Sequence, residues 1–137
     1  SYWLHAWSQR RPLRYIGFGG NGFQVRDALH PSDLGLLLAA QMQSPGKDAP
    51  SVIHAAGGIE NSLSLAELSD WCAGRFGPYM VAREEAERPF DIPWMVMDCG
   101  VAEHAWNWRP QRSMTSILEE IARHAEAHPE WLDLSRG

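Results

Sequence analysis

Two arginines carry the first chemistry that this sequence suggests. Arg26 lies in the run QVRDALHPSDL (24–34) and Arg88 lies in the run ERPFDIP (87–93), each in an extended segment beside residues that disfavour a helix. A guanidinium offers a planar fork of donors that matches phosphate oxygens in pairs, and it stays charged at any working pH. The pattern therefore predicts that both arginines hold one diphosphate. The alternative for each is an ion pair with a nearby surface carboxylate.

Two further polar side chains accompany these arginines. Gln24 and Arg26 are two positions apart in an alternating, strand-like pattern, so their side chains point to the same face. Asp91 follows Arg88 by three positions, and its carboxylate either accepts hydrogen bonds from ribose hydroxyls or shapes the turn before Ile92. The residues alone leave these two roles of Asp91 open.

The catalytic half of such chemistry is missing from the sequence. There is no nucleophile elbow, no P-loop and no paired-carboxylate arrangement, and the six histidines lack a metal-ligand spacing. We therefore predict no catalytic residue and no metal site. Gly17, Gly19 and Gly22 satisfy G-x-G-x-x-G, but a dinucleotide fingerprint needs its last glycine to open a helix. Because β-favouring residues 23–26 follow instead, we predict a strand-to-strand loop and no cofactor-binding residue.

Composition limits the class of protein. A chain of 137 residues with 45% hydrophobic residues fits one domain with its own core. A net charge of −5 argues against a nucleic-acid partner, and no apolar run approaches the ~20 residues that span a membrane. Two cysteines, Cys72 and Cys99, do not make a disulfide framework, which favours a reducing, cytoplasmic environment.

The order of the expected elements indicates an α/β fold, because strands and helices alternate along the chain. Strands are expected at 13–18, 23–29, 52–55 and 79–83. Helices are expected at 2–10, from Pro31 and Ser32 to before Ser44, from Ser64 to Arg75, at 98–106, and from Ser113 or Thr115 onward. Ser64 and Glu67 form a capping-box pattern. The chain begins at Ser1 inside an expected helix, and we interpret it as a piece of a longer protein.

Four motifs, in the same order, resemble those of one family. The motifs lie at 11–20 continuing into 24–30, at 61–65 running through Trp71 and Cys72, at 88–93, and at 108–110. Over essentially its whole length the chain resembles the C-terminal half of the extended short-chain dehydrogenase/reductases that act on nucleotide sugars. Within that family it is most similar to the enzymes that epimerise CDP-sugars at C2, the CDP-paratose 2-epimerases.

The resemblance implies roles for particular residues. The arginines of the two matching motifs contact the substrate diphosphate in the family, which implies this role for Arg26 and Arg88. The same reasoning gives Asp91 a ribose contact and makes Tyr15 or Ile16 a candidate contact to the base. With Gln24 on the face of Arg26, these residues form the expected substrate site. Phe90 stands where relatives usually have glycine, which affects the path of the loop that aims Asp91.

The resemblance also implies what lies outside this chain. The parent enzyme would use NAD, but the glycine fingerprint and the Tyr-x-x-x-Lys pair would precede Ser1, so this chain alone is expected to be inactive. Residues 25–41 and 51–56 would complete the sheet of the missing N-terminal, NAD-binding half. We therefore expect exposed sheet edges and apolar patches, covered by self-association, by the missing domain or by a rearranged fold.

Two other functions remain open from the sequence. The parent could be a UDP- or dTDP-sugar 4-epimerase or a 4,6-dehydratase, since these share the arginine positions. Alternatively, the chain could be a stand-alone module that binds a nucleotide sugar without catalysis. The sequence preceding Ser1 in the parent would separate the enzymes from one another.

Overall fold

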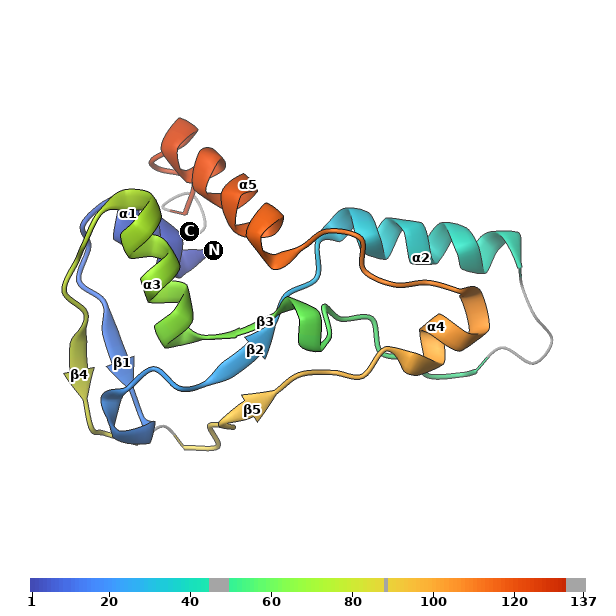
Figure 1. Ribbon diagram of the computed structural model, residues 1–137, viewed down its shortest axis with the longest axis horizontal. Helices are drawn as coiled ribbons and strands as arrows, with labels where there is room; N and C mark the ends of the chain where they lie inside the picture. The colour runs from blue at the N-terminus through green and yellow to red at the C-terminus, as the bar shows by residue number, and fades with distance from the viewer. Residues whose placement is uncertain (45–49, 88, 133–137) are drawn as a thin grey trace. The chain divides into compact units, whose positions relative to one another are not determined.

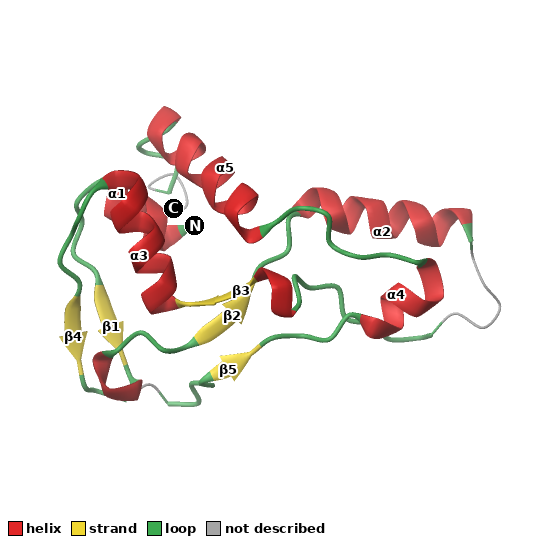
Figure 2. Ribbon diagram, viewed as in Figure 1, coloured by secondary structure: helices red, strands yellow, loops and turns green. Residues whose placement is uncertain are grey.

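The computed structural model describes residues 1–44, 50–87 and 89–132, which form helices and short strands (Figures 1 and 2). The helices are α1 (Tyr2–Ser8), α2 (Pro31–Gln43), α3 (Leu65–Phe76), α4 (Gly100–Trp106) and α5 (Met114–Ala127). The strands are β1 (Arg14–Ile16), β2 (Val25–Asp27), β3 (Ser62–Ser64), β4 (Ala82–Glu84) and β5 (Trp94–Met95). The chain folds into two compact units, each built from segments that are distant in sequence. The predicted α/β class is confirmed.

The first unit contains Ser1–Val25, Leu63–Trp94 and Leu118–Gly137. Its strands β1 and β4 pair in parallel, with Arg14 opposite Ala82. Two tryptophans of α1 anchor this unit: Trp3 Nε1 donates to Ser69 Oγ at 3.0 Å and Trp7 Nε1 donates to the Gly77 carbonyl at 3.0 Å. Because the indole N–H of the half-buried Trp3 and that of the buried Trp7 both have a partner, these two rings pack into the unit without an unsatisfied donor.

The second unit contains Arg26–Ser62 and Met95–Ile117. Its core gathers Leu37, Ala102 and Trp108. The buried Asp33 joins two segments of this unit, because its carbonyl accepts from Trp108 Nε1 at 2.8 Å and its Oδ2 accepts from the Arg112 N–H at 3.0 Å. One residue, through its backbone carbonyl and its carboxylate, thus fixes the start of α2 against the loop that precedes α5.

A second sheet has three short strands in the order β3-β2-β5. The loop before β5 extends the pairing, since the Val25 N–H donates to the Pro93 carbonyl at 2.9 Å. Beyond the other end of β2, the Ala28 N–H donates to the Asn61 carbonyl at 2.9 Å. The sequence did not predict β3 or β5, because strands of three and two residues are too short to show an alternating pattern.

The predicted helices are all present, and their boundaries have identifiable causes. The capping box of α3 is confirmed: the Glu67 N–H donates to Ser64 Oγ, and the Ser64 N–H donates to Glu67 Oε2 at 2.7 Å. Helix α2 is capped by a residue that the sequence did not single out, since His30 Nδ1 accepts from the Ser32 N–H at 3.1 Å. A histidine can replace a short polar cap here because its Nδ1 reaches the first turn.

The buried strand expected at 52–55 was wrong. These residues form no strand, and the Val52 side chain is 74% exposed. A strand in a parallel sheet needs hydrogen-bonding neighbours along its edges. None of the strands in the described part of the chain runs beside residues 52–55, so their apolar composition alone does not produce one.

Candidate functional site

A small pocket lies at the carboxyl ends of β1 and β4 in the first unit. Gly17 and Phe18 follow β1 directly, and Glu87 and Asp91 come from the loop after β4. These four residues line a volume of about 130 Å³. Parallel strands place their carboxyl ends at the same edge, and in α/β proteins that edge is where ligands usually bind. The topology therefore makes this pocket the candidate site.

Glycines shape the loop that forms one wall of the pocket. Gly20 has φ +66°, and a Cβ there would lie 3.0 Å from Arg83 Cβ in β4. Gly22 has φ +70°, and a Cβ there would lie 2.7 Å from the ring of Tyr15. Since only glycine combines this backbone with such close packing, the loop can turn tightly against both strands.

Two phenylalanines at this site have left-handed backbone conformations. Phe18 has φ +49° and Phe90 has φ +62°. A bulky residue at positive φ is strained and rare, and such strain gathers at functional sites. Phe18 lines the pocket, whereas Phe90 lies between the two pocket residues of the second loop and its side chain is fully exposed. The positive φ of Phe90 is one that glycine adopts freely, so phenylalanine keeps a backbone path suited to glycine.

Asp91 lines the pocket and also shapes its own turn. Its Oδ1 accepts from the Ile92 N–H at 3.0 Å, and the residue is half-buried. The sequence left open whether Asp91 binds a ribose or shapes the turn. The turn contact is present, and the position in the pocket is compatible with a ligand contact as well.

The three predicted contacts on β1 and before β2 lie close to one another. Gln24 Nε2 donates to the Ile16 carbonyl at 2.8 Å, which ties the segment before β2 to β1. The Tyr15 ring stacks on Trp3 with centroids 5.6 Å apart. Tyr15 therefore packs inside the first unit, while Ile16 immediately precedes the pocket residues. Their contact with a substrate stays a prediction.

The two arginines differ in what the structure shows of them. Arg26 lies half-buried in β2, where the second unit begins. Arg88 lies outside the described residues. The shared diphosphate site of Arg26 and Arg88 therefore stays a prediction. The sequence had missed Gly17, Phe18 and Glu87 as site residues, although the position of each beside a strand end was the available signal.

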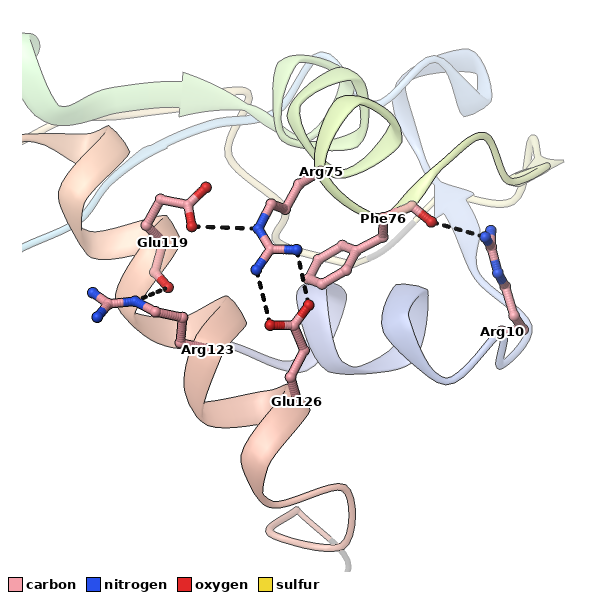
Figure 3. A network of polar contacts seen from close by, with 6 residues as sticks. All are labelled: Arg10, Arg75, Phe76, Glu119, Arg123 and Glu126. Carbon is pink, nitrogen blue, oxygen red and sulfur yellow. Dashed lines mark hydrogen bonds and ion pairs between the residues drawn. The ribbon is translucent and has the colours of Figure 1, made fainter.

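Other polar groups of the first unit are engaged in structure. Arg75 binds both carboxylate oxygens of Glu126 at 2.8 Å and contacts Glu119 at 3.3 Å (Figure 3). The hydrogen bond to Glu126 is the main cause of the raised pKa of Arg75. This fork joins α3 to α5, and Figure 3 shows the two carboxylates on either side of the guanidinium. Arg75 is thus a packing residue of the unit.

The two cysteines are free thiols with raised pKa values. Burial raises the pKa of Cys72 to about 12, and burial also raises the pKa of Cys99. A nucleophilic cysteine needs a lowered pKa, so neither thiol has the character of a nucleophile. Among residues 1–44, 50–87 and 89–132, no group of three or more potential ligands could hold a metal ion. Nor does this part of the chain contain a helix long and apolar enough to cross a membrane.

The glycine-rich loop does not fit a dinucleotide. A short 3₁₀ turn, Phe18–Gly20, follows the first glycine, and β2 follows Gly22. A pyrophosphate site of the fingerprint type needs a helix N-terminus at that point. Helix α2 begins only at Pro31, so the prediction of a strand-to-strand loop is confirmed.

Comparison with known proteins shows that the chain is similar in sequence to part of a sugar epimerase. No family model matches the sequence. The CDP-paratose 2-epimerase of Salmonella typhi is 33% identical in an alignment of 108 residues that covers 74% of this chain and 30% of that enzyme. This likeness, with the shared fold described next, confirms the resemblance to the NAD-dependent sugar epimerases of the extended short-chain dehydrogenase/reductase family.

Solved structures share the fold. An epimerase from Methanothermobacter thermautotrophicus matches 98% of this chain with a TM-score of 0.77 at 18% identity. The UDP-glucuronic acid 4-epimerase of Bacillus cereus, solved with UDP-glucuronic acid and NAD, matches 90% with a TM-score of 0.74 at 18% identity. The chain spans 38% of each of those proteins. The chain therefore shares the fold of a part of those proteins and spans somewhat more than a third of their length.

Proposed function

We propose that this chain is the nucleotide-binding part of an NAD-dependent epimerase that acts on a CDP-sugar at C2. The observation that carries the proposal is the likeness to a CDP-paratose 2-epimerase, joined to a pocket at the carboxyl ends of β1 and β4. The pocket includes Asp91, for which the sequence suggested a ribose contact. The reducing interior of a cell suits the two free cysteines.

The roles within this function divide between the chain and the rest of the enzyme. Arg26 and Arg88 would hold the diphosphate, Asp91 the ribose, and Ile16 or Tyr15 the base, with Gln24 beside them. NAD, when bound in such an enzyme, would accept a hydride from the carbon that is inverted and return it to the same carbon. The glycine-rich loop lacks the helix N-terminus of a dinucleotide fingerprint, so we assign NAD binding and the catalytic residues to the rest of the parent enzyme. The isolated chain would bind a nucleotide and catalyse nothing.

A second candidate function is a UDP-sugar 4-epimerase. The fold is shared with a UDP-glucuronic acid 4-epimerase and with a UDP-glucose 4-epimerase of Thermotoga maritima, which has a TM-score of 0.74 at 17% identity. The two candidates differ in the base that the chain should recognise. Binding of CDP against UDP therefore separates them.

Calorimetric titration of the purified chain with CDP, UDP and NAD, each alone, tests the proposal. We expect CDP to bind and NAD not to bind. Arg26→Ala should weaken CDP by about 10- to 100-fold, because a charge-assisted hydrogen bond contributes roughly 1.5–3 kcal/mol. Arg14→Ala is the matched control, because Arg14 pairs with Glu84 on the surface. Failure to bind any nucleotide, or binding of NAD alone, would contradict the proposal.

We also propose that residues 25–41 and 51–56 complete the sheet of the NAD-binding half. Supporting this, the residues of these segments include exposed apolar side chains: Leu34, Leu36, Leu38 and Val52. Co-expression with the preceding part of the parent protein should give one stable complex by size-exclusion chromatography. Two separately eluting proteins would count against this assignment.

A further inference from the structure

The pocket beside β1 and β4 has a chemistry that suits one part of a nucleotide. Its lining combines an aromatic ring, Phe18, with two carboxylates, Glu87 and Asp91, and the backbone of Gly17. Carboxylates in so small a space repel a phosphate, so the phosphates must lie elsewhere. A planar ring with hydrogen-bond donors fits better, because it can stack on phenylalanine and donate to a carboxylate.

The strained phenylalanines strengthen this interpretation. Phe18 and Phe90 hold positive φ angles on the two loops that follow β1 and β4, and the described non-glycine residues with positive φ are these two with Arg10 and Asn107. Phe90 exposes its whole ring, which gains no burial energy to offset the strain. Phe90 is a large apolar side chain at a position that suits glycine, and no packing by the described residues supports it. Contact between its ring and a ligand would explain why the phenylalanine is present.

The two carboxylates differ in what they can offer a ligand. Asp91 Oδ1 already accepts from the Ile92 N–H. Glu87 is exposed and makes no hydrogen bond or ion pair with the described residues. An ionised carboxylate only accepts, so Glu87 favours a base with an exocyclic amino group. Cytosine presents such a donor at N4, whereas uracil, like thymine, presents an acceptor at O4.

We infer that this pocket is a base subsite in which Glu87 selects cytosine over uracil, Phe18 in the lining stacks on the ring, and Phe90, which lies beside Asp91 but outside the lining, adds contact area to the bound base. The inference rests on the proposed function, because it names the residues that choose the nucleotide of that same site. Glu87 determines specificity, and the phenylalanines supply contact area for either pyrimidine. Base selection by Glu87 and ring contact by the phenylalanines do not depend on where the phosphates bind.

Titration of the chain and three variants with CDP and UDP tests the inference. The wild-type chain should prefer CDP by about 10-fold or more, as expected for one good contact to a base edge. Glu87→Gln should bring the ratio close to one, because its amide can donate to uracil O4 as well as accept from cytosine N4. Phe90→Gly should weaken both nucleotides by a similar factor. Met80→Ala, which truncates another exposed apolar side chain, should change neither.

Thermal unfolding of Phe90→Gly supplies a readout that does not depend on ligand. Relief of the left-handed strain should raise the unfolding midpoint by about 3 °C. Phe90→Ala removes the ring but keeps most of the strain, so it should weaken binding without that rise. If Phe90→Gly binds the nucleotides more weakly than wild type but unfolds at a higher temperature, then the Phe90 ring contributes to ligand binding and not to stability.

The outcomes separate this inference from the function on which it rests. If the wild-type chain binds neither nucleotide, the proposed function and the inference both fail. If it binds CDP and UDP equally, or if Glu87→Gln keeps the preference for CDP, the base-selecting role is wrong while nucleotide binding stands. If Phe90→Gly and Phe90→Ala bind as tightly as wild type, the aromatic contact at Phe90 is wrong.

Discussion

Helices α5 and α2 are nearly equal in length, but they differ in how many of their apolar side chains are buried. Helix α5 buries one apolar face, consisting of Ile117, Leu118, Ala122 and Ala125. Helix α2 buries Leu37 and the side chain of Asp33, and it exposes Leu34, Leu36, Leu38 and Met42. A helix with apolar residues on several sides is normally covered on several sides. The contrast shows that α5 packs its apolar face within this chain, and it fits the proposal that α2 contacts the NAD-binding half of the parent enzyme.

The largest difference should appear when one leucine is truncated in each helix. Leu118 in α5 is 7% exposed, so Leu118→Ala should lower the free energy of unfolding by about 2–5 kcal/mol through lost burial and a cavity. Leu38 in α2 is 52% exposed, so Leu38→Ala should change it by less than about 0.5 kcal/mol. Urea denaturation measures both. Equal losses at the two positions would remove the contrast between the helices.

Asp33 tests whether the buried side of α2 is held by a specific polar contact. Asp33→Ala should cost about 1–3 kcal/mol, because the Arg112 N–H loses its acceptor inside the second unit. Asp33→Asn keeps an oxygen acceptor and serves as the matched control, with a smaller loss. Urea unfolding curves compare the two variants. An alanine variant as stable as the asparagine variant would show that the contact contributes little.

Disruption of the capping box of α3 should lower the free energy of unfolding by less than the truncation of Leu118 does, but by more than changes on the exposed side of α2. Ser64→Ala should cost about 1 kcal/mol, because it removes the acceptor for the Glu67 N–H. Hydrogen bonds from the Ser64 backbone and hydroxyl lower the pKa of Glu67 below its ordinary value of 4.5. A lowered folded-state pKa stabilises the protein above the unfolded pKa, and that stabilisation is lost as the pH falls through the folded value.

The difference in stability between wild type and Glu67→Gln should therefore be full at neutral pH and shrink in acid. Unfolding measured between neutral pH and pH values below the ordinary pKa of Glu67 checks this. A difference that stays constant over that range would mean that the ionised carboxylate is not the group that caps α3.

The smallest effect on stability is expected on the exposed side of α2. Leu34, Leu38 and Met42 are spaced four apart and so share one face of the helix. Replacing all three with glutamine should change the free energy of unfolding by less than about 0.5 kcal/mol per site. The same change should reduce self-association in sedimentation velocity experiments, because it removes an apolar stripe. A variant that associates as strongly as wild type would show that this face is not the contact.

Sequence reasoning predicted the helices well, since their signals are local. The Ser64 and Glu67 pair predicted the start of α3, and the expected end at Arg75 lies one residue from the observed end at Phe76. The prediction of a strand at 52–55 was wrong because a buried strand depends on neighbouring strands, and a local sequence pattern carries no information about them. The short strands β3 and β5 were missed because three and two residues are too few to show an alternating pattern.

The candidate site was predicted less completely than the fold. Asp91 was recognised from its motif and lines the pocket, whereas the glycine loop was predicted only as a strand-to-strand loop and also forms part of the pocket wall. Glu87 and Phe18 were missed as site residues because only the parallel pairing of β1 with β4 brings their loops together. Positive φ at Phe90 is likewise a property of the folded loop, although its replacement of a usual glycine pointed to it.

The most direct test of the central claim is the effect of CDP on the backbone amide resonances of the isotopically labelled chain. We predict that added CDP shifts the amides of Gly17, Phe18, Glu87 and Asp91, with little change along α2 and α5. Shifts confined to other parts of the chain, or no shifts at all, would contradict the assignment of a nucleotide site to the pocket beside β1 and β4.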